Sequence, residues 1–318
     1  MRKIELHCHF DGSLDPVFAS HLVGKDVRAQ MVGKGFQTLG EYLEKFALPI
    51  QLLQTESALE EFSQLLAQAL VCDDVIYAEI RFCPLLHAKR GLTPHQIVAT
   101  VLRGLRRVPT IKTNLILCLM RNFSFSENNQ IFNLAQEWLG HGICAIDLAG
   151  DEAAYPTADF EELFRRVQIS KIPFTIHAGE ADGPASIEAA LHFGAQRIGH
   201  GVRAIESATV IERLKKRHIP IEVCPTSNFD TGVYRHVEDY PIKRLLRDGV
   251  AVTINTDNRT VSDTSLTQEY QFLQEHFGFT PQDFLRCNIN AALGAFLPAA
   301  EKVELIKELL ADADYMPD

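Results

Sequence analysis

Apolar residues along this chain follow two alternating patterns. Short apolar runs typical of strands lie at 4–9, 76–82, 112–120, 145–149, 174–178, 197–200, 219–224 and 250–256. Stretches with the apolar spacing of helices fill most of the gaps, among them 57–70, 93–108, 128–140 and 159–170. Alternation of this kind indicates parallel βαβ units, as in α/β folds. Eight strands with intervening helices predict a single (β/α)8 barrel of the TIM type.

The connection between the first two predicted strands is much longer than the others. It spans about 11–74 and contains further helical patterns, such as 38–50. This insertion predicts extra helices over one mouth of the barrel, where they either close over a ligand as a lid or only add packing. No linker or low-complexity segment divides the chain, so we expect one domain over 1–318, with a frayed tail at about 311–318.

Composition narrows the class of partner. The chain has 318 residues, of which 46% are hydrophobic and 23% charged, and its formal net charge is −10. These values allow a large core, and the acidic balance disfavours binding to nucleic-acid backbones. We expect an uncharged or cationic small molecule as ligand, with neither nucleic acid nor membrane as a partner. Whether the protein is a monomer or a homo-oligomer stays open.

Cysteine usage and the N-terminal residues bear on the cellular compartment. The seven cysteines are scattered without a C-x-x-C pair, and most lie in apolar runs, which is typical of reduced core residues. The first ten residues enter a strand pattern directly, unlike the apolar region of a signal peptide, and no apolar stretch has the length of a membrane span. The sequence therefore predicts a cytoplasmic protein.

The first predicted strand carries two histidines on one face. Side chains alternate along a strand, so in IELHCHF (4–10) the apolar residues share one face, and Glu5, His7 and His9 share the other. In a barrel the apolar face meets the helices and the polar face points inward. Both imidazoles then lie at the carboxyl end of the strand, where barrel active sites are found. A single buried histidine is usually structural, but two at this spacing favour metal ligands.

Other strand ends bring polar residues to the same rim. His177 ends the fifth strand and Glu180 follows it by three residues, His200 ends the sixth strand between two glycines, and Asp257 follows the eighth. Each could have a local structural role, but their convergence favours a shared site. The ligand set is His7, His9, His177 and Asp257, which suits one Zn²⁺ per chain with one coordination position left for water.

Six short motifs occur in order along the chain. They are HCHFDG (7–12), DLAGDE (147–152), HAGE (177–180), GHG (199–201), CPTSN (224–228) and NTDN (255–258). Together they resemble the adenosine deaminase family of metal-dependent hydrolases. The resemblance implies zinc-dependent hydrolysis of the 6-amino group of adenosine, and of 2′-deoxyadenosine, with adenosine giving inosine and ammonia. A purine nucleoside is the small-molecule partner that it implies.

The same resemblance implies roles for individual residues. Glu180 would donate a proton to ring N1, His200 would orient the attacking water, and Asp257 would serve as zinc ligand and proton acceptor. The substrate-binding residues would be His9, Asp11 at a ribose hydroxyl, Gly150 at N3, Asn258 at N7, and Leu39, Tyr42 and Phe46 as an apolar lid. Asn258 stands where much of the family has aspartate, but its amide can donate to N7 at any working pH.

The sequence is also compatible with other activities. The same chemistry could act on free adenine or on another 6-aminopurine nucleoside, such as aminodeoxyfutalosine. The protein could also bind zinc and a nucleoside without catalysis, although Glu180 and His200 disfavour this, because binding alone needs no proton donor. The fourth strand ends without a lysine that could bridge two metals, and the absence of C-x-x-C disfavours a site of the cytidine deaminase type.

Overall fold

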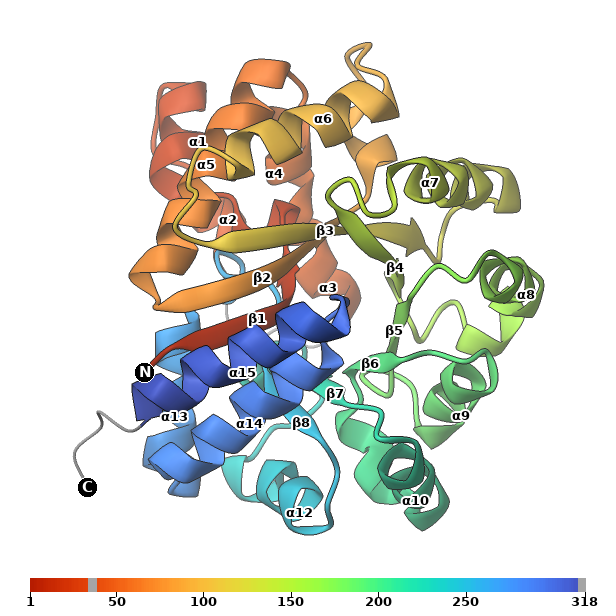
Figure 1. Cartoon of the computed structure of the whole chain (residues 1–318). Helices are drawn as coiled ribbons and strands as arrows, with labels where there is room; N and C mark the ends of the chain where they lie inside the picture. Colours follow the sequence, from red (N-terminus) through yellow and green to blue (C-terminus); the bar gives the residue numbers. More distant parts are fainter. Residues whose placement is uncertain (34–38, 314–318) are drawn as a thin grey trace.

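Parallel strands form the centre of the molecule, with helices around them (Figure 1). The computed structural model describes residues 1–33 and 39–313, apart from the side chain of Leu39. Within that part, eight strands form two parallel sheets, in the orders β1-β2-β3-β4 and β5-β6-β7-β8. Isolated parallel bridges from Ile146 to Phe174 and from Cys8 to Asp257 join the two sheets at both edges. The predicted α/β architecture with parallel strands is confirmed.

The strands coincide with the predicted apolar runs to within two residues at each end. They are β1 (Lys3–His9), β2 (Val75–Phe82), β3 (Lys112–Met120), β4 (Ile143–Ala149), β5 (Thr175–Ala178), β6 (Arg197–His200), β7 (Ile221–Val223) and β8 (Val252–Ile254). The pairing is in register along most of each ladder, for example Tyr77 with Lys112 and Ile221 with Val252.

Helices follow most of the strands. The α-helices are α1 (Pro16–Val23), α2 (Arg28–Met31), α3 (Leu39–Leu43), α4 (Ala47–Leu52), α5 (Glu56–Cys72), α6 (Pro94–Leu105), α7 (Phe125–Trp138), α8 (Glu161–Ser170), α9 (Pro184–His192), α10 (Ala208–Arg217), α11 (Pro225–Asp230), α12 (Ile242–Arg247), α13 (Leu266–Phe277), α14 (Pro281–Gly294) and α15 (Ala299–Ala313). Short 3-10 helices are η1 (Asp11–Ser13), η2 (Glu44–Phe46), η3 (Pro84–His87), η4 (Thr157–Phe160), η5 (Val202–Glu206) and η6 (Val237–Asp239).

Helix α6 shows how the sequence encodes the helical layer. Thr93 forms a capping box with Gln96, and Pro94 at the first position presets the helical backbone. Its buried stripe has helical spacing and consists of Ile97, Val98, Val101, Leu102 and Leu105. Burial of each large aliphatic side chain contributes about 1.5–3 kcal/mol. Packing of this stripe into the main core therefore stabilises α6 more than helix propensity does.

The two faces of β1 divide as the alternation predicts. Ile4 and Leu6 pack in a hydrophobic cluster with residues of α14 and α15. On the opposite face, Glu5 accepts hydrogen bonds from Thr256 after β8, and His7 contacts Glu222 of β7. A shift of one residue would exchange these faces, so burial on both sides specifies the register of β1.

Two regions lie outside the repeating strand and helix pattern. The segment between β1 and β2 contains η1, η2 and α1 to α5. After β8 come α13, α14 and α15, of which the last extends to Ala313, three residues into the predicted tail. The rest of that tail, 314–318, lies outside the described residues. In the part of the chain that the structure covers, no helix has both the length and the apolar composition to span a membrane.

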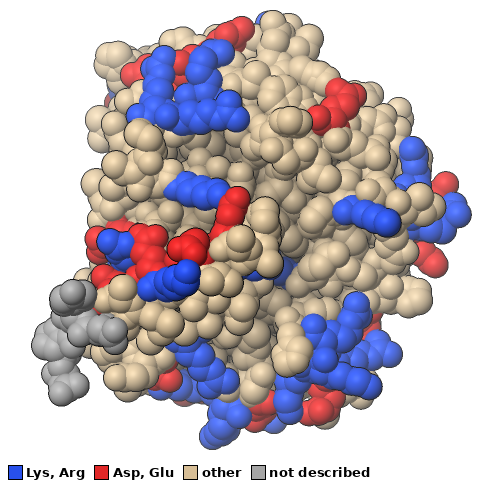
Figure 2. Space-filling view, viewed as in Figure 1, with Lys and Arg blue, Asp and Glu red and all other residues tan. Residues whose placement is uncertain are grey.

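Charged side chains of both signs lie close together on the surface. Figure 2 shows basic and acidic residues as neighbours around the visible face, with uncharged residues over much of its centre. Exposed ion pairs include Arg103 with Glu56 and Glu60. Such pairs at the surface contribute at most about 1 kcal/mol each, so they add little to the stability of the fold.

Candidate active site

Four potential metal ligands meet where the strands end. His7 and His9 come from β1, His177 comes from β5, and Asp257 follows β8. Their ligand atoms all lie within 4.8 Å of one another. His9 Nε2 is 3.1 Å from His177 Nε2, and Asp257 Oδ1 is 3.4 Å from His7 Nε2 and 3.3 Å from His9 Nε2. The fold therefore brings together the four residues that the sequence selected, and their role as ligands stays a prediction.

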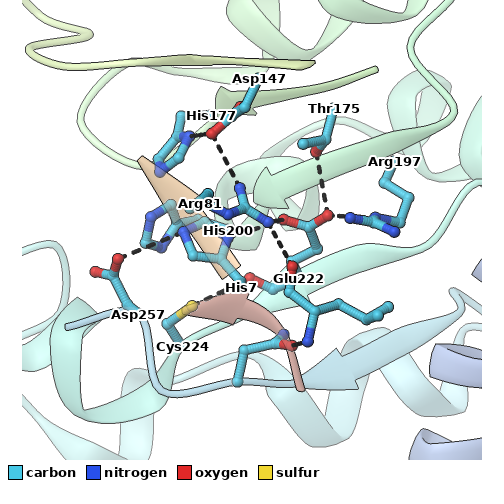
Figure 3. Close-up of polar contacts among 12 residues, drawn as sticks. His7, Arg81, Asp147, Thr175, His177, Arg197, His200, Glu222, Cys224 and Asp257 are labelled. Atoms are coloured by element: carbon cyan, nitrogen blue, oxygen red, sulfur yellow. Dashed lines mark hydrogen bonds and ion pairs between the residues drawn. The ribbon is translucent and has the colours of Figure 1, made fainter. Parts of the chain in front are cut away.

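Two buried carboxylates contact the Nδ1 atoms of His7 and His177 (Figure 3). His7 Nδ1 donates to Glu222 Oε2 at 2.8 Å, and His177 Nδ1 lies 2.9 Å from Asp147 Oδ2. A carboxylate at Nδ1 fixes the ring and leaves Nε2 directed toward the shared centre. Arg81 donates to both carboxylates, from Nη1 to Asp147 at 3.0 Å and from Nη2 to Glu222 at 2.8 Å.

Arginine charges keep these buried carboxylates ionised. Burial opposes ionisation of Glu222, but Arg81 and Arg197 outweigh it and hold the pKa of this carboxyl well below its usual value. Burial likewise opposes ionisation of Asp147, and nearby His177 and Arg81 hold its pKa below the usual range. Removal of one member would leave a buried charge unpaired, which commonly costs about 3–5 kcal/mol. The network therefore favours one orientation of the His7 and His177 rings.

The two residues predicted to handle protons face each other. Glu180 Oε2 lies 3.4 Å from His200 Nε2, and Asn228 Nδ2 lies 3.1 Å from His200 Nδ1. Burial, and then the charge of Asp257, raises the pKa of Glu180 well above its usual value. Burial, and then the charge of His7, lowers the pKa of His200 well below its usual value. The site therefore favours the protonated form of the Glu180 carboxyl and the neutral form of the His200 imidazole.

The backbone of the site is strained at two positions. His200 has a φ of +56° and Asp257 a φ of +58°, both in the left-handed region. This conformation costs roughly 1–3 kcal/mol for a residue other than glycine. At the neighbouring Gly199, a Cβ atom would lie 3.1 Å from His177 Cα and 3.2 Å from His7 Cε1. Strain and close packing at one place are typical of a functional site.

A cavity of about 410 Å³ lies beside these residues. Polar parts of its wall are His9, His177, Glu180, His200 and Asp257. Tyr42 and Phe46, from the long insertion, contribute apolar parts of the wall. The side chain of Leu39, the third residue of the predicted apolar lid, lies outside the described part of the chain.

Asp11, Gly150 and Asn258 also line the cavity. Asp11 Oδ1 is 2.6 Å from Nε2 of the buried His87. Gly150 has a φ of +107°, which favours glycine. Asn258 Oδ1 is buried without a hydrogen-bond partner among the described residues, and it packs so closely on Gly12 that a Cβ there would lie 1.9 Å away. Contacts of these three residues with a substrate stay predictions.

Several residues that support the site were not identified from the sequence. Asp147 and Glu222 are charged residues inside apolar strand runs, and that signal could have marked them as members of a buried polar network. Ser227 Oγ donates to Asp257 Oδ2 at 2.6 Å. Glu152, in the DLAGDE motif, accepts hydrogen bonds from the backbone of the loop that carries Glu180. These partners are distant in sequence, so local pattern could not pair them.

The donor set fits a zinc ion. Three imidazoles and one carboxylate are ligands that Zn²⁺ accepts. His7 Nε2 is buried and has no hydrogen-bond partner among the residues described, whereas its Nδ1 is bound to Glu222. A buried imidazole nitrogen without a partner is expected when that nitrogen coordinates a metal. The geometry and chemistry of these residues therefore agree with a metal centre.

Comparison with known sequences agrees with this geometry. The model of the adenosine deaminase family matches residues 2–312. An adenosine deaminase from Haemophilus ducreyi is 40% identical over 326 aligned residues, which cover 96% of this chain and 95% of that protein.

Solved structures share the fold. Adenine deaminase from Arthrobacter aurescens superimposes with a TM-score of 0.90 at 24% identity, covering 98% of this chain and 99% of that chain. An amidohydrolase from Burkholderia ambifaria with bound Zn gives a TM-score of 0.90 at 20% identity, with coverage of 99% and 91%. At these identities the likeness concerns the fold alone. The family match and the curated relative confirm the resemblance carried by the motifs, and the chain belongs to the adenosine deaminase family.

Proposed function

We propose that this protein catalyses zinc-dependent hydrolytic deamination of adenosine, and of 2′-deoxyadenosine, with adenosine giving inosine and ammonia. The observation that carries the proposal is one cavity in which a His₃Asp set of possible ligands lies beside the Glu180 carboxyl, whose pKa is raised, and the His200 imidazole, whose pKa is lowered. Hydrolysis of an aromatic amine needs an activated water, a group to orient it and an acid for the ring nitrogen. A protein that only bound zinc and a nucleoside would not need this combination.

His7, His9, His177 and Asp257 would hold one Zn²⁺. When bound, the ion supplies a water whose pKa is lowered toward neutrality. Asp147 and Glu222 would keep His177 and His7 in the tautomer that presents Nε2 to the metal. This arrangement is the support for assigning the ligands to one centre.

Glu180 would act as the general acid. Its raised pKa favours the protonated carboxyl, which can donate to purine N1 and neutralise the charge that develops as water adds to C6. His200 would orient the attacking water through Nε2. Burial opposes ionisation of Asp257, but the adjacent imidazoles of His7 and His9 hold its pKa below the usual range. The ionised Asp257 would accept a proton from the water as the C6–O bond forms and pass it to the amino group, so that ammonia leaves as the C6–N bond breaks. The proton of the C6 hydroxyl would then return to the Glu180 carboxylate, which leaves the C6 carbonyl of inosine.

The opposite part of the cavity would recognise the nucleoside. Asp11 would accept a hydrogen bond from a ribose hydroxyl, the Gly150 amide would donate to N3, and Asn258 would donate to N7. Of the described residues that line the cavity, none is lysine or arginine, and Asp11 and Asp151 add negative charge. A 5′-phosphate would therefore be disfavoured, because phosphate recognition normally uses cationic donors. This observation supports a nucleoside rather than a nucleotide as substrate.

We further propose that the eight strands form a closed (β/α)8 barrel in one domain over 1–318, with residues 11–74 as a lid. Two observations support closure, namely the bridges at both edges of the two sheets. Tyr42, Phe46 and Ile50 of the insertion line the cavity, as a lid requires. Closure of such a segment over a ligand would exclude bulk water from the reacting groups.

The experiment that tests the function compares substrates on zinc-loaded protein. Adenosine, 2′-deoxyadenosine, adenine and AMP are incubated separately, and purine products and ammonia are measured. We expect inosine and ammonia in equal amounts from adenosine, and little product from AMP. A higher kcat/KM for adenine than for adenosine would identify adenine as the preferred substrate. That result would favour the alternative activity, deamination of free adenine. If zinc-loaded, folded protein deaminated none of the four compounds, the proposed catalytic activity would be wrong.

A further inference from the structure

Glu152 has an unusual set of hydrogen bonds for a residue outside the cavity wall. Its Oε1 accepts from the Gly179 N–H at 2.7 Å. Its Oε2 accepts from the N–H groups of three further consecutive residues, Glu180, Ala181 and Asp182, at 2.9, 2.8 and 3.0 Å. One buried carboxylate thus binds four successive amides of the loop after β5. This loop carries Glu180, the proposed general acid.

A second chain of contacts connects the same carboxylate to the start of the loop. Ser186 Oγ donates to Glu152 Oε1 at 2.5 Å and lies 2.6 Å from Thr157 Oγ1. Arg121 Nη2 donates to Thr157 Oγ1 at 2.9 Å and to the His177 carbonyl oxygen at 2.6 Å. The loop is therefore held at its amides by Glu152 and at the preceding carbonyl by Arg121.

We propose that Glu152 is a positioning residue, which binds the backbone of residues 179–182 so that the Glu180 side chain stays directed at the purine. The inference rests on the proposed function, because it assigns Glu152 an effect that passes through the acid Glu180. The backbone faces one way and the side chain the other: the amides of the loop point to Glu152, whereas the Glu180 carboxyl lines the cavity. Gly179, at a φ of +74°, permits the turn between His177 and the acid.

Chemistry explains why a carboxylate serves here. Hydrogen bonds from amides to an ionised acceptor are shorter and stronger than neutral ones. A glutamine at this position would offer one acceptor oxygen, and its NH₂ group would face amide donors. The negative charge of Glu152 also acts on the acid, because Glu152 is one of the groups that raise the pKa of Glu180, after burial and Asp257. Both effects predict that loss of the carboxylate impairs the acid step more than substrate binding.

The test is a double-mutant cycle between Glu152→Gln and Glu180→Gln on zinc-loaded protein. Glu162→Gln, an exposed position on α8, is the matched control and should keep wild-type kcat. We expect Glu152→Gln to lower kcat by about 10²-fold, since displacement of a catalytic group by about 1 Å costs this much, while KM changes by less than about threefold. Inosine formation is followed with enzyme in excess, so that slow variants give measurable rates.

The cycle separates positioning from general structural support. If Glu152 acts through Glu180, its replacement should cost less than about threefold when Glu180 is already Gln. The same fold-loss in both backgrounds would overturn the inference, because a merely structural residue harms every reaction path equally. Zinc content and thermal unfolding of each variant are measured in parallel, and an equal loss of zinc in both backgrounds would also count against it.

A second variant keeps the test decisive if Glu152→Gln does not fold. Ser186→Ala removes one donor to the Glu152 carboxylate and leaves the charge in place. It should lower kcat by about 3–10-fold and show the same non-additivity with Glu180→Gln. Additive losses would overturn the inference. Near-normal kcat in Glu180→Gln itself would instead refute the proposed acid, and inactive wild type would refute the proposed function.

Discussion

Replacement of Asp147 by Asn tests whether a carboxylate in contact with a proposed ligand imidazole strengthens zinc binding. Asp147 Oδ2 is the atom that contacts both His177 Nδ1, at 2.9 Å, and Arg81 Nη1, at 3.0 Å. Asparagine keeps one acceptor oxygen of the same reach but removes the negative charge. Because an anionic partner makes the imidazole a better ligand, we expect Asp147→Asn to weaken zinc binding while the fold is retained.

The magnitude follows from the contacts. Replacement of an outer partner of a metal-binding histidine costs about 10–100-fold in metal affinity, or about 1.4–2.7 kcal/mol. Asp147 Oδ1 is buried and has no hydrogen-bond partner among the described residues. The new NH₂ group would take this place and stay unsatisfied, at a cost of about 1–3 kcal/mol in unfolding free energy. Arg81 would keep its contact with Glu222 at 2.8 Å, which limits the damage.

Two measurements separate zinc affinity from stability. Competition with a chromophoric chelator gives the zinc affinity of each variant, and thermal unfolding of metal-free protein gives its stability. Glu269→Gln is the matched control, because Glu269 is equally buried but bonds to Thr226 and Thr264 rather than to an imidazole. We expect it to change stability and to leave zinc affinity within about threefold of wild type. Wild-type zinc affinity in folded Asp147→Asn would refute the reasoning.

Three further predictions concern the residues of the site. His7→Ala or His177→Ala should lose zinc and activity together, and metal analysis should find one zinc per wild-type chain; two tightly held metals, both needed for turnover, would contradict this. Glu180→Gln should keep zinc and lower kcat by about 10²–10⁴-fold. Because the pKa of Glu180 is raised, its protonated form persists through the usual range of a carboxyl group and is lost above the raised value, so wild-type kcat should fall there on the alkaline side and the variant should lack this decline. Wild type should bind 7-deazaadenosine more weakly than adenosine by about 1–3 kcal/mol, and Asn258→Ala should discriminate less; equal discrimination would show that Asn258 does not contact N7.

The strands were predictable because they are buried on both faces. A parallel strand between helices is an almost continuous apolar run, and such runs stand out even without an alignment of relatives. The carboxyl ends of parallel strands converge, so polar residues placed there, such as His177 and His200, could be assigned to one rim. The alternation of strands and helices does not predict helices α13 to α15, because it stops at the last strand and these helices follow it.

The contacts that tune the site were less predictable. Glu79 and Arg81 lie two apart on one strand face, and local pattern makes them natural partners. In the structure Glu79 pairs with Arg197 of β6, and Arg81 pairs with Asp147 and Glu222 of β4 and β7. These pairs cross the interior between strands that are far apart in sequence. Alternation gives the face of a residue, but which charges meet there depends on the stagger of the strands and on side-chain length.

The balance of buried charge supports the prediction of one divalent ion. The interior cluster joins two arginines to four carboxylates, and its members are Arg81, Arg197, Glu79, Asp147, Glu222 and Asp257. With the imidazoles counted as neutral, the formal charges of these six side chains sum to two negative charges away from water, and an uncompensated buried charge is costly. One Zn²⁺ among the ligands would cancel this charge, whereas two would leave an excess of positive charge. The same balance explains why loss of the Asp147 carboxylate should weaken zinc binding even though its hydrogen bonds can be replaced. We therefore expect a single ion on the ground of these buried charges as well as on the absence of a lysine at the end of the fourth strand.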